Sequence, residues 1–127
     1  KKVSLNHIDN ASQKIEKDKM LDIIESEPTQ FQLVLYAIML LSERRDIKNI
    51  FTGDVFNVYQ EVCEKTKNEV LTQRRISDIL AEFDMLGIIN AKVISKGRQG
   101  RTREIKLMLG PNVKDKALEI LKKSLDL

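Results

Sequence analysis

The chain has 127 residues, a length that fits one domain with at most a fragment of a second. Its 42% apolar and 32% charged residues, with only two prolines, predict a core under a strongly solvated surface and exclude a low-complexity chain. The net charge is a modest +3, and the single cysteine, Cys63, excludes an intrachain disulfide and indicates a reducing compartment.

Residues 5–26 have the spacing of a long helix with two apolar stripes, Ile8, Ala11 and Ile15 on one and Met20, Ile23 and Ile24 on the other. A charged run at 16–19 separates the stripes, so the two halves are expected to pack against different partners, as at a domain junction. The start has no signal-peptide pattern and no initiating Met, and we expect the chain to be a piece of a longer protein.

The next predicted helix, 29–45, is apolar on nearly all sides and is expected at the centre of the core. Thr29 and Gln32 have the spacing of a capping box directly after Pro28. The longest apolar run lies near Leu33 to Leu41, whereas a membrane span needs roughly 20 residues. No membrane partner is therefore expected.

Two more helices are predicted over 53–66 and 73–86, capped by Thr52 and Thr72. Their inward positions are Val55, Val58, Tyr59 and Val62 in the first, and Ile76, Ile79, Leu80, Phe83 and Leu86 in the second. Gly87 stands where a helix end favours glycine. Cys63 shares the apolar face and is interpreted as a buried structural residue. The only histidine, His7, has no second imidazole with which to share a metal and is interpreted as structural.

After Gly87 the apolar period changes from 3.6 to 2, which indicates two strands. A turn centred on Gln99 would pair 93 with 105, 91 with 107 and 89 with 109, and would place one apolar set on a single buried face: Ile89, Ala91, Val93, Ile105, Leu107 and Leu109. A last helix is expected over 112–126, with Val113, Leu118, Leu121 and Leu125 on its apolar side.

This order predicts a mainly α fold with a β-hairpin wing (α+β). It is a winged helix-turn-helix, preceded by a long helix and followed by a C-terminal helix. The distribution of charge along the chain indicates a functional role for the wing. Residues 72–106 carry eight Lys or Arg against four Asp or Glu, a balance of +4, while the remainder carries 14 against 15, a balance of −1.

The hairpin tip concentrates this charge in Lys96, Arg98, Arg101 and Arg103, interleaved with Gly97, Gln99, Gly100 and Thr102. Like charges this close repel one another unless an anion is present. The glycines let the backbone approach a phosphate ridge, and arginines can enter a narrow minor groove. The alternative is a solvated basic turn with ordinary hairpin glycines.

The helix before the hairpin opens with Thr72, Gln73, Arg74 and Arg75, and Ser77 also points away from its core stripe. Arginine can bind guanine, and glutamine adenine, in a major groove, while Thr72 and free N–H groups of the first turn can bind phosphate. The alternative is a plain cap plus an Arg74–Asp78 ion pair worth about 0.3–0.5 kcal/mol. Because both elements of a winged helix face the same side, the neighbouring basic hairpin favours DNA binding.

Catalytic motifs are missing from the sequence. It has neither a GxxxxGK[ST] phosphate loop nor a GxGxxG turn, and no Ser or Cys nucleophile has a histidine placed to serve it. The sequence therefore predicts no catalytic residue, no metal site and no cofactor in this segment.

Three stretches together resemble archaeal origin-recognition initiators, the relatives of eukaryotic origin-recognition and Cdc-type loading factors. They are LTQRRISDILAEFDMLGIINAKVISKGRQGRTREIKL (71–107), HIDNASQKIEKDKMLDIIESEP (7–28) and FTGDVFNVYQEVCEK (51–65). The pairing of TQRR, DMLGIINA and KGRQGRT is the most specific part, because generic winged helices do not share it.

The resemblance implies an AAA+ ATPase as the parent protein, with ATP or ADP and Mg held by a part outside this chain. It implies that 1–20 is the last helix of the ATPase lid domain with a linker, and that 21–127 is a winged-helix domain. Helix 72–86 would enter the major groove and wing 95–103 would straddle backbone and minor groove. The partners implied are double-stranded origin DNA, the replicative helicase and paralogous initiators. The segment is expected to be monomeric and to act in the cytoplasm at the nucleoid.

A second hypothesis remains open. Met85 and Ala81 on the exposed face of the same helix would suit an apolar contact in a protein-docking winged helix, which would bind the helicase or another initiator subunit.

Overall fold

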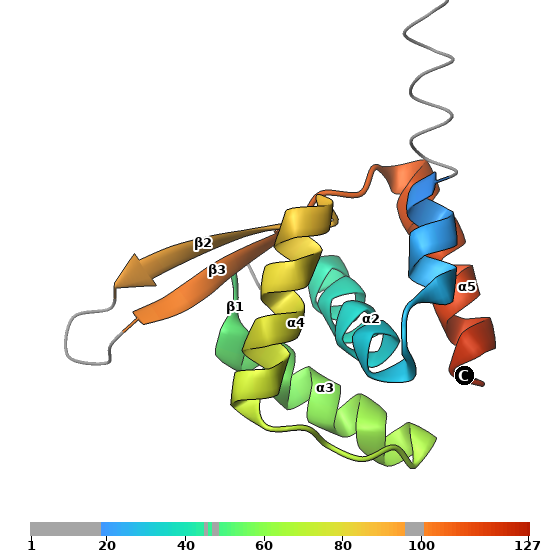
Figure 1. Cartoon of the computed structure of the whole chain (residues 1–127), viewed down its shortest axis with the longest axis horizontal. Helices are drawn as coiled ribbons and strands as arrows, with labels where there is room; N and C mark the ends of the chain where they lie inside the picture. The colour runs from blue at the N-terminus through green and yellow to red at the C-terminus, as the bar shows by residue number, and fades with distance from the viewer. Residues whose placement is uncertain (1–18, 45, 47–48, 96–100) are drawn as a thin grey trace, which may run out of the picture.

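The computed structural model describes residues 19–44, 46, 49–95 and 101–127. A helical segment, 19–26, is followed by α2 (Thr29–Glu43), β1 (Ile50–Phe51), α3 (Thr52–Thr66), α4 (Gln73–Leu86), β2 (Ile89–Ser95), β3 (Arg101–Leu107) and α5 (Pro111–Ser124) (Figure 1). The predicted order is confirmed, with β1 as an addition. The start of the predicted helix 5–26 lies outside the described residues, so the division at residue 20 stays a prediction.

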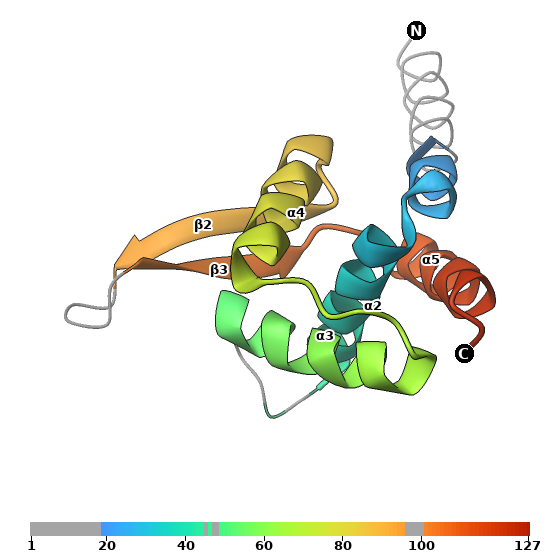
Figure 2. The same cartoon turned by 60° about the horizontal axis from the view of Figure 1, so that its bottom comes forward.

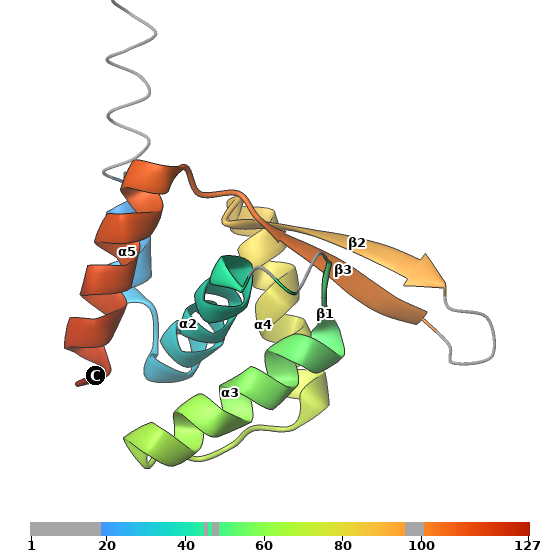
Figure 3. The same cartoon turned by 180° about the vertical axis from the view of Figure 1, so that it is seen from behind.

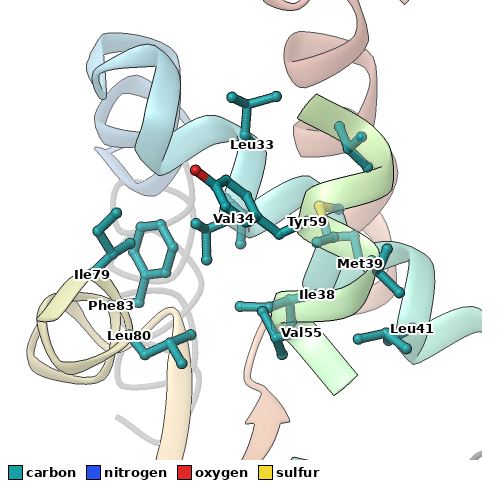
Figure 4. Close-up of a cluster of buried hydrophobic side chains, with 14 of the residues drawn as sticks. Leu33, Val34, Ile38, Met39, Leu41, Val55, Tyr59, Ile79, Leu80 and Phe83 are labelled. Carbon is teal, nitrogen blue, oxygen red and sulfur yellow. The ribbon is translucent and has the colours of Figure 1, made fainter. Parts of the chain in front are cut away.

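Helix α2 forms the centre of the core, as predicted. Its buried side chains include Leu33, Val34, Leu35, Ala37, Ile38, Met39 and Leu41, and they meet apolar residues of α3 and α4 (Figure 4). The Phe31 and Phe83 rings pack edge to face, with 5.8 Å between ring centres. The helix ends at Glu43, two residues earlier than predicted, and Arg44 is its extended C-cap.

The predicted capping box at Thr29 and Gln32 is wrong. Pro28 is the N-cap of α2, and no side chain caps this end. Gln32 is buried instead, and its Nε2 donates to the main-chain oxygens of Ile24 (3.1 Å) and Glu25 (3.2 Å). These carbonyls lie at the end of the 19–26 helix and need hydrogen-bond donors. Because Gln32 on α2 supplies them, its side chain connects the two helices.

The predicted cap of α3 is also wrong. Thr52 is the first residue of the helix, and Phe51 is its N-cap. The carboxylate of Asp54, in the first turn of the helix, accepts a hydrogen bond from the Phe51 N–H at 3.0 Å. This bond gives the main-chain N–H at the start of the helix a partner. The predicted inward face is confirmed, because Val55, Val58, Tyr59, Val62 and Cys63 are all buried.

The sheet has the order β1-β3-β2, with both pairs antiparallel. Ile89 pairs with Leu107, Ala91 with Ile105 and Val93 with Arg103, so the predicted register is wrong by two residues. A shift of two keeps each side chain on its face. Ile89 and Ile105 are buried accordingly, but Val93 is 56% exposed because the far part of the hairpin extends past the core.

The hairpin projects from one side of the helical body, and α5 and the C-terminus lie on the opposite side (Figures 1 and 3). Helix α5 begins at Pro111 and ends at Ser124, so it starts one residue earlier and ends two residues earlier than predicted. Val113, Leu121 and Leu125 are buried as expected, and Ala117 is buried with them, while Leu118 is only partly covered. The far part of the hairpin thus lies away from α5.

Candidate nucleic-acid interface

The start of α4 presents a polar edge whose direction is fixed by the core. Ile76, Ile79, Leu80 and Phe83 are buried, which turns Gln73, Arg74 and Arg75 outward to solvent. The hydroxyl of Thr72 accepts a hydrogen bond from the Arg75 N–H at 3.3 Å, so the predicted cap is confirmed. Gly87 ends the helix with a φ of 80°, as its position predicted.

The wing is attached to α4 by hydrogen bonds on one side of the helix. Nη1 of Arg103 on β3 donates to the main-chain oxygen of Ser77 at 2.8 Å. At the other end of α4, the carboxylate of Asp84 accepts from the Ala91 N–H of β2 at 3.0 Å. The hairpin therefore has a defined position relative to the outward edge of α4.

Helix α3 also contributes to this side of the molecule. The Thr52 hydroxyl lies 3.4 Å from the Arg103 main-chain oxygen, and Figure 2 shows the first turns of α3 and α4 beside β3. An open groove runs between α3, α4 and the β2–β3 hairpin, and it is lined by Thr52, Gly53, Gln73, Ser77, Val93, Thr102 and Arg103. Donors and small side chains of α3, α4 and the hairpin thus converge on one hollow.

Part of the predicted site lies along this groove. Gln73, Ser77, Thr102 and Arg103 line it, and Arg74 and Arg75 are exposed on the first turn of α4. Arg101 is placed in β3 by its backbone. The predicted Lys96, Gly97, Arg98, Gln99 and Gly100 lie outside the described residues. No ion pair joins Arg74 to Asp78, although the structure describes both, so the arginine is not engaged by that neighbour.

Sequence reasoning missed three residues that line the groove. Thr52 and Gly53 come from a distant segment and were assigned only to a helix start, and Val93 was assigned to the core. For Val93 the only usable signal was the alternation of apolar and polar residues along the hairpin. That alternation gave the face of the sheet on which Val93 lies, but not how far the core extends along the strand.

The turn between α3 and α4 depends on Tyr59, another residue that sequence reasoning placed simply in the core. The Tyr59 hydroxyl accepts from the Leu71 N–H at 2.8 Å and donates to Oε1 of Gln30 at 2.6 Å. Burial raises the pKa of Tyr59 to about 12. A tyrosine on a buried face needs a partner for its hydroxyl, so the residue type was a usable signal.

Among residues 19–44, 46, 49–95 and 101–127, no three His, Cys, Asp or Glu side chains gather to hold a metal ion. Within the same ranges no helix combines the length and apolarity needed to span a bilayer.

Three helices followed by a hairpin, with the third helix and the hairpin joined along one groove, define a winged helix-turn-helix domain. The chain belongs to the family of CDC6 C-terminal winged helix domains, whose model matches residues 22–117. The fold class and the resemblance expected from the sequence are both confirmed.

Similar proteins agree with this assignment. The ORC1-type DNA replication protein of Pyrococcus furiosus is 56% identical over 106 residues, which are 84% of this chain and 25% of that protein. ORC1-type DNA replication protein 4 of Haloarcula marismortui is 50% identical over 102 residues, 80% of this chain and 19% of that protein. A solved structure of the Aeropyrum pernix ORC1 protein in complex with DNA aligns with a TM-score of 0.80 and 34% identity, over 90% of this chain and 29% of that one. The chain thus spans less than a third of the length of each of these proteins.

Proposed function

We propose that this chain binds double-stranded DNA at replication origins with a sequence preference, as the C-terminal module of a replication initiator. The first turn of α4 enters the major groove, and the β2–β3 wing lies on the backbone and the adjacent minor groove. The proposal is supported by the Aeropyrum pernix relative, whose structure is of ORC1 in complex with DNA.

The hydrogen bond from Arg103 to the Ser77 main-chain oxygen is the observation that carries the proposal. It fixes the wing beside α4, so one duplex can meet both elements at once. Two separate polar patches on different sides of the domain would not allow this.

The proposed contacts divide by chemistry. Gln73 and Arg74 are exposed at the helix start, where long donors can reach base edges. Thr72, Arg75 and Ser77 flank them and contact the sugar-phosphate backbone of the DNA. On the wing, Lys96, Arg98 and Arg101 neutralise phosphates or enter the minor groove, Gly97 and Gly100 permit close approach, and Gln99 and Thr102 are further contacts. Arg103 belongs to the set through its hydrogen bond to Ser77, which holds the wing beside α4.

The rest of the proposal concerns the whole protein. We infer a parent AAA+ ATPase, with ATP or ADP and Mg bound outside this chain, and with the replicative helicase and paralogous initiators as partners. Since the ATPase part would also touch DNA, this chain alone should bind less tightly and less selectively than its parent.

The test is the salt dependence of duplex binding by the 127-residue chain, measured by fluorescence anisotropy. The double variant Arg98→Ala, Arg101→Ala should weaken binding to all duplexes and reduce the slope of log K against log salt by about one unit per lost phosphate contact. A matched control is Lys122→Ala, Lys123→Ala, which removes the same charge from exposed positions on α5, opposite the wing. Unchanged binding by the wing variant would refute the proposal.

A second function, protein docking, is favoured by one observation. Met85 on the outward face of α4 is 82% exposed, and Ala81 one turn earlier is exposed as well. A pure docking domain should show negligible affinity for random duplex even at low salt, whereas the DNA-binding proposal predicts clear affinity that declines as salt rises.

A further inference from the structure

Tyr59 has an unusual combination of burial and polar contacts. It lies on α3, is 0% exposed, and Figure 4 draws its ring within the cluster of buried side chains. A phenylalanine would satisfy that apolar environment. The hydroxyl nevertheless makes two short hydrogen bonds, from the Leu71 N–H and to Gln30, so it serves a purpose that the apolar pattern alone does not require.

Both bonds control the turn between α3 and α4. Gln30 on α2 accepts a hydrogen bond from the Tyr59 hydroxyl at Oε1 and donates from Nε2 to the Glu69 main-chain oxygen at 2.8 Å. Two side chains, one from α2 and one from α3, therefore bind a carbonyl and an N–H of the same short turn. Residues 68–72 of that turn belong to no helix or strand. The two side chains therefore provide hydrogen bonds that main-chain groups give one another within a helix or a sheet.

The turn leads directly into the proposed DNA contacts. Leu71 is followed by the cap Thr72 and then by Gln73 and Arg74. Reading a base edge requires donors held within about 0.5 Å of their productive position. A bond to the Leu71 N–H acts close enough in sequence to determine where the first turn of α4 stands.

We infer that Tyr59 is a positioning residue for DNA recognition: through Leu71, and together with Gln30, its hydroxyl sets the placement of the first turn of α4 and with it the sequence preference of binding. The inference rests on the proposed function. It assigns a specificity role to a side chain that lies inside the domain and touches no DNA.

The test uses the full chain with the single-atom variant Tyr59→Phe. The probe pair is a duplex selected by the wild-type chain from a randomised pool and a scrambled duplex of the same length and composition. Tyr59→Phe should lower the affinity ratio between the two by roughly three- to tenfold, while affinity for the scrambled duplex changes little. Gln30→Ala, at a half-buried position, should shift the ratio in the same direction.

A control separates positioning from general loss of stability. Val113→Ala creates a small cavity at a buried site on α5 and leaves the turn untouched, so it should lower stability without lowering the ratio. A second readout needs no DNA: amide hydrogen exchange at Leu71 and in the first turn of α4 should accelerate in Tyr59→Phe and not in Val113→Ala.

The outcomes are distinct. An unchanged ratio in both Tyr59→Phe and Gln30→Ala, or an equal fall in Val113→Ala, would overturn the inference. If the wild-type chain binds no duplex, the proposed function fails, and the exchange measurement alone then decides whether the hydroxyl places the helix start.

Discussion

Arg103 on the wing and Ser77 on α4 are joined by a 2.8 Å hydrogen bond from a guanidinium to a main-chain oxygen. The two residues are 26 positions apart in the sequence. Their contact connects the helix proposed to read bases with the hairpin proposed to follow the backbone. The angle between the two elements is therefore a property of the folded domain before any DNA arrives.

Replacing Arg103 tests that connection. Arg103→Met keeps an apolar stem and removes the donors, which should cost about 1 kcal/mol of stability and weaken duplex binding. Because the guanidinium is engaged with Ser77, we expect the salt slope of binding to change little. A fall in slope of about one unit would instead identify Arg103 as a phosphate contact.

Gln73 tests base reading. Gln73→Ala should cost about 1–3 kcal/mol on the preferred duplex and much less on a scrambled one, because glutamine can bind adenine through two hydrogen bonds. Asn112→Ala, an exposed amide on α5 opposite the wing, is the matched control and should alter neither affinity. Equal losses on both duplexes would show that Gln73 contacts only the backbone.

Glu27 tests an electrostatic cost inside the domain. Burial, with repulsion from Glu82 second, raises the pKa of Glu27 above its usual value of 4.5. The folded state therefore favours the neutral carboxyl of Glu27. The resulting contribution to the free energy of unfolding is present at low pH and is lost as pH rises through the pKa of the folded state. Glu27→Gln should increase the free energy of unfolding near pH 7.

The control for this prediction is internal. The gain from Glu27→Gln should disappear below about pH 4, where the wild-type carboxyl is protonated in both states, and should shrink in a Glu82→Gln background. Urea unfolding of the four chains at two pH values gives the comparison. A gain that persists at low pH would assign the effect to packing rather than charge.

Tyr59 gives a prediction at the alkaline end. Its pKa is raised to about 12 by burial, so the protonated form is favoured in the folded state. The stabilisation is complete below the ordinary tyrosine pKa of about 10 and is lost as pH rises through the folded pKa. The stability advantage of wild type over Tyr59→Phe should therefore shrink between about pH 10 and pH 12 in urea titrations. A difference in stability between the two proteins that stays constant over this pH range would contradict the raised pKa of Tyr59.

Local signals made the helices predictable. Thr72 before an apolar stripe and Gly87 after it gave both ends of α4, because capping depends on residues within one turn. The same stripe gave the outward direction of Gln73 and Arg74. Patterns of period 3.6 and 2 then gave the order of elements and hence the fold class.

Features that depend on distant partners were not predictable in the same way. Gln32 was taken for a capping residue, but its partners are the carbonyls that end another helix. Alternation gave the face of Val93 but not its exposure, which depends on how far the hairpin extends past the core. The Arg103–Ser77 contact brings together two segments whose spacing in the sequence carries no pattern.

The most direct test of the shared surface is a map of backbone amide shifts of the labelled chain as random duplex is added at low salt. If one duplex meets both elements, the shifts should cluster on the first turn of α4, from Thr72 to Ser77, and on the β2–β3 wing, with α5 unaffected. Shifts confined to α5 and the 19–26 helix, with the wing unchanged, would contradict it.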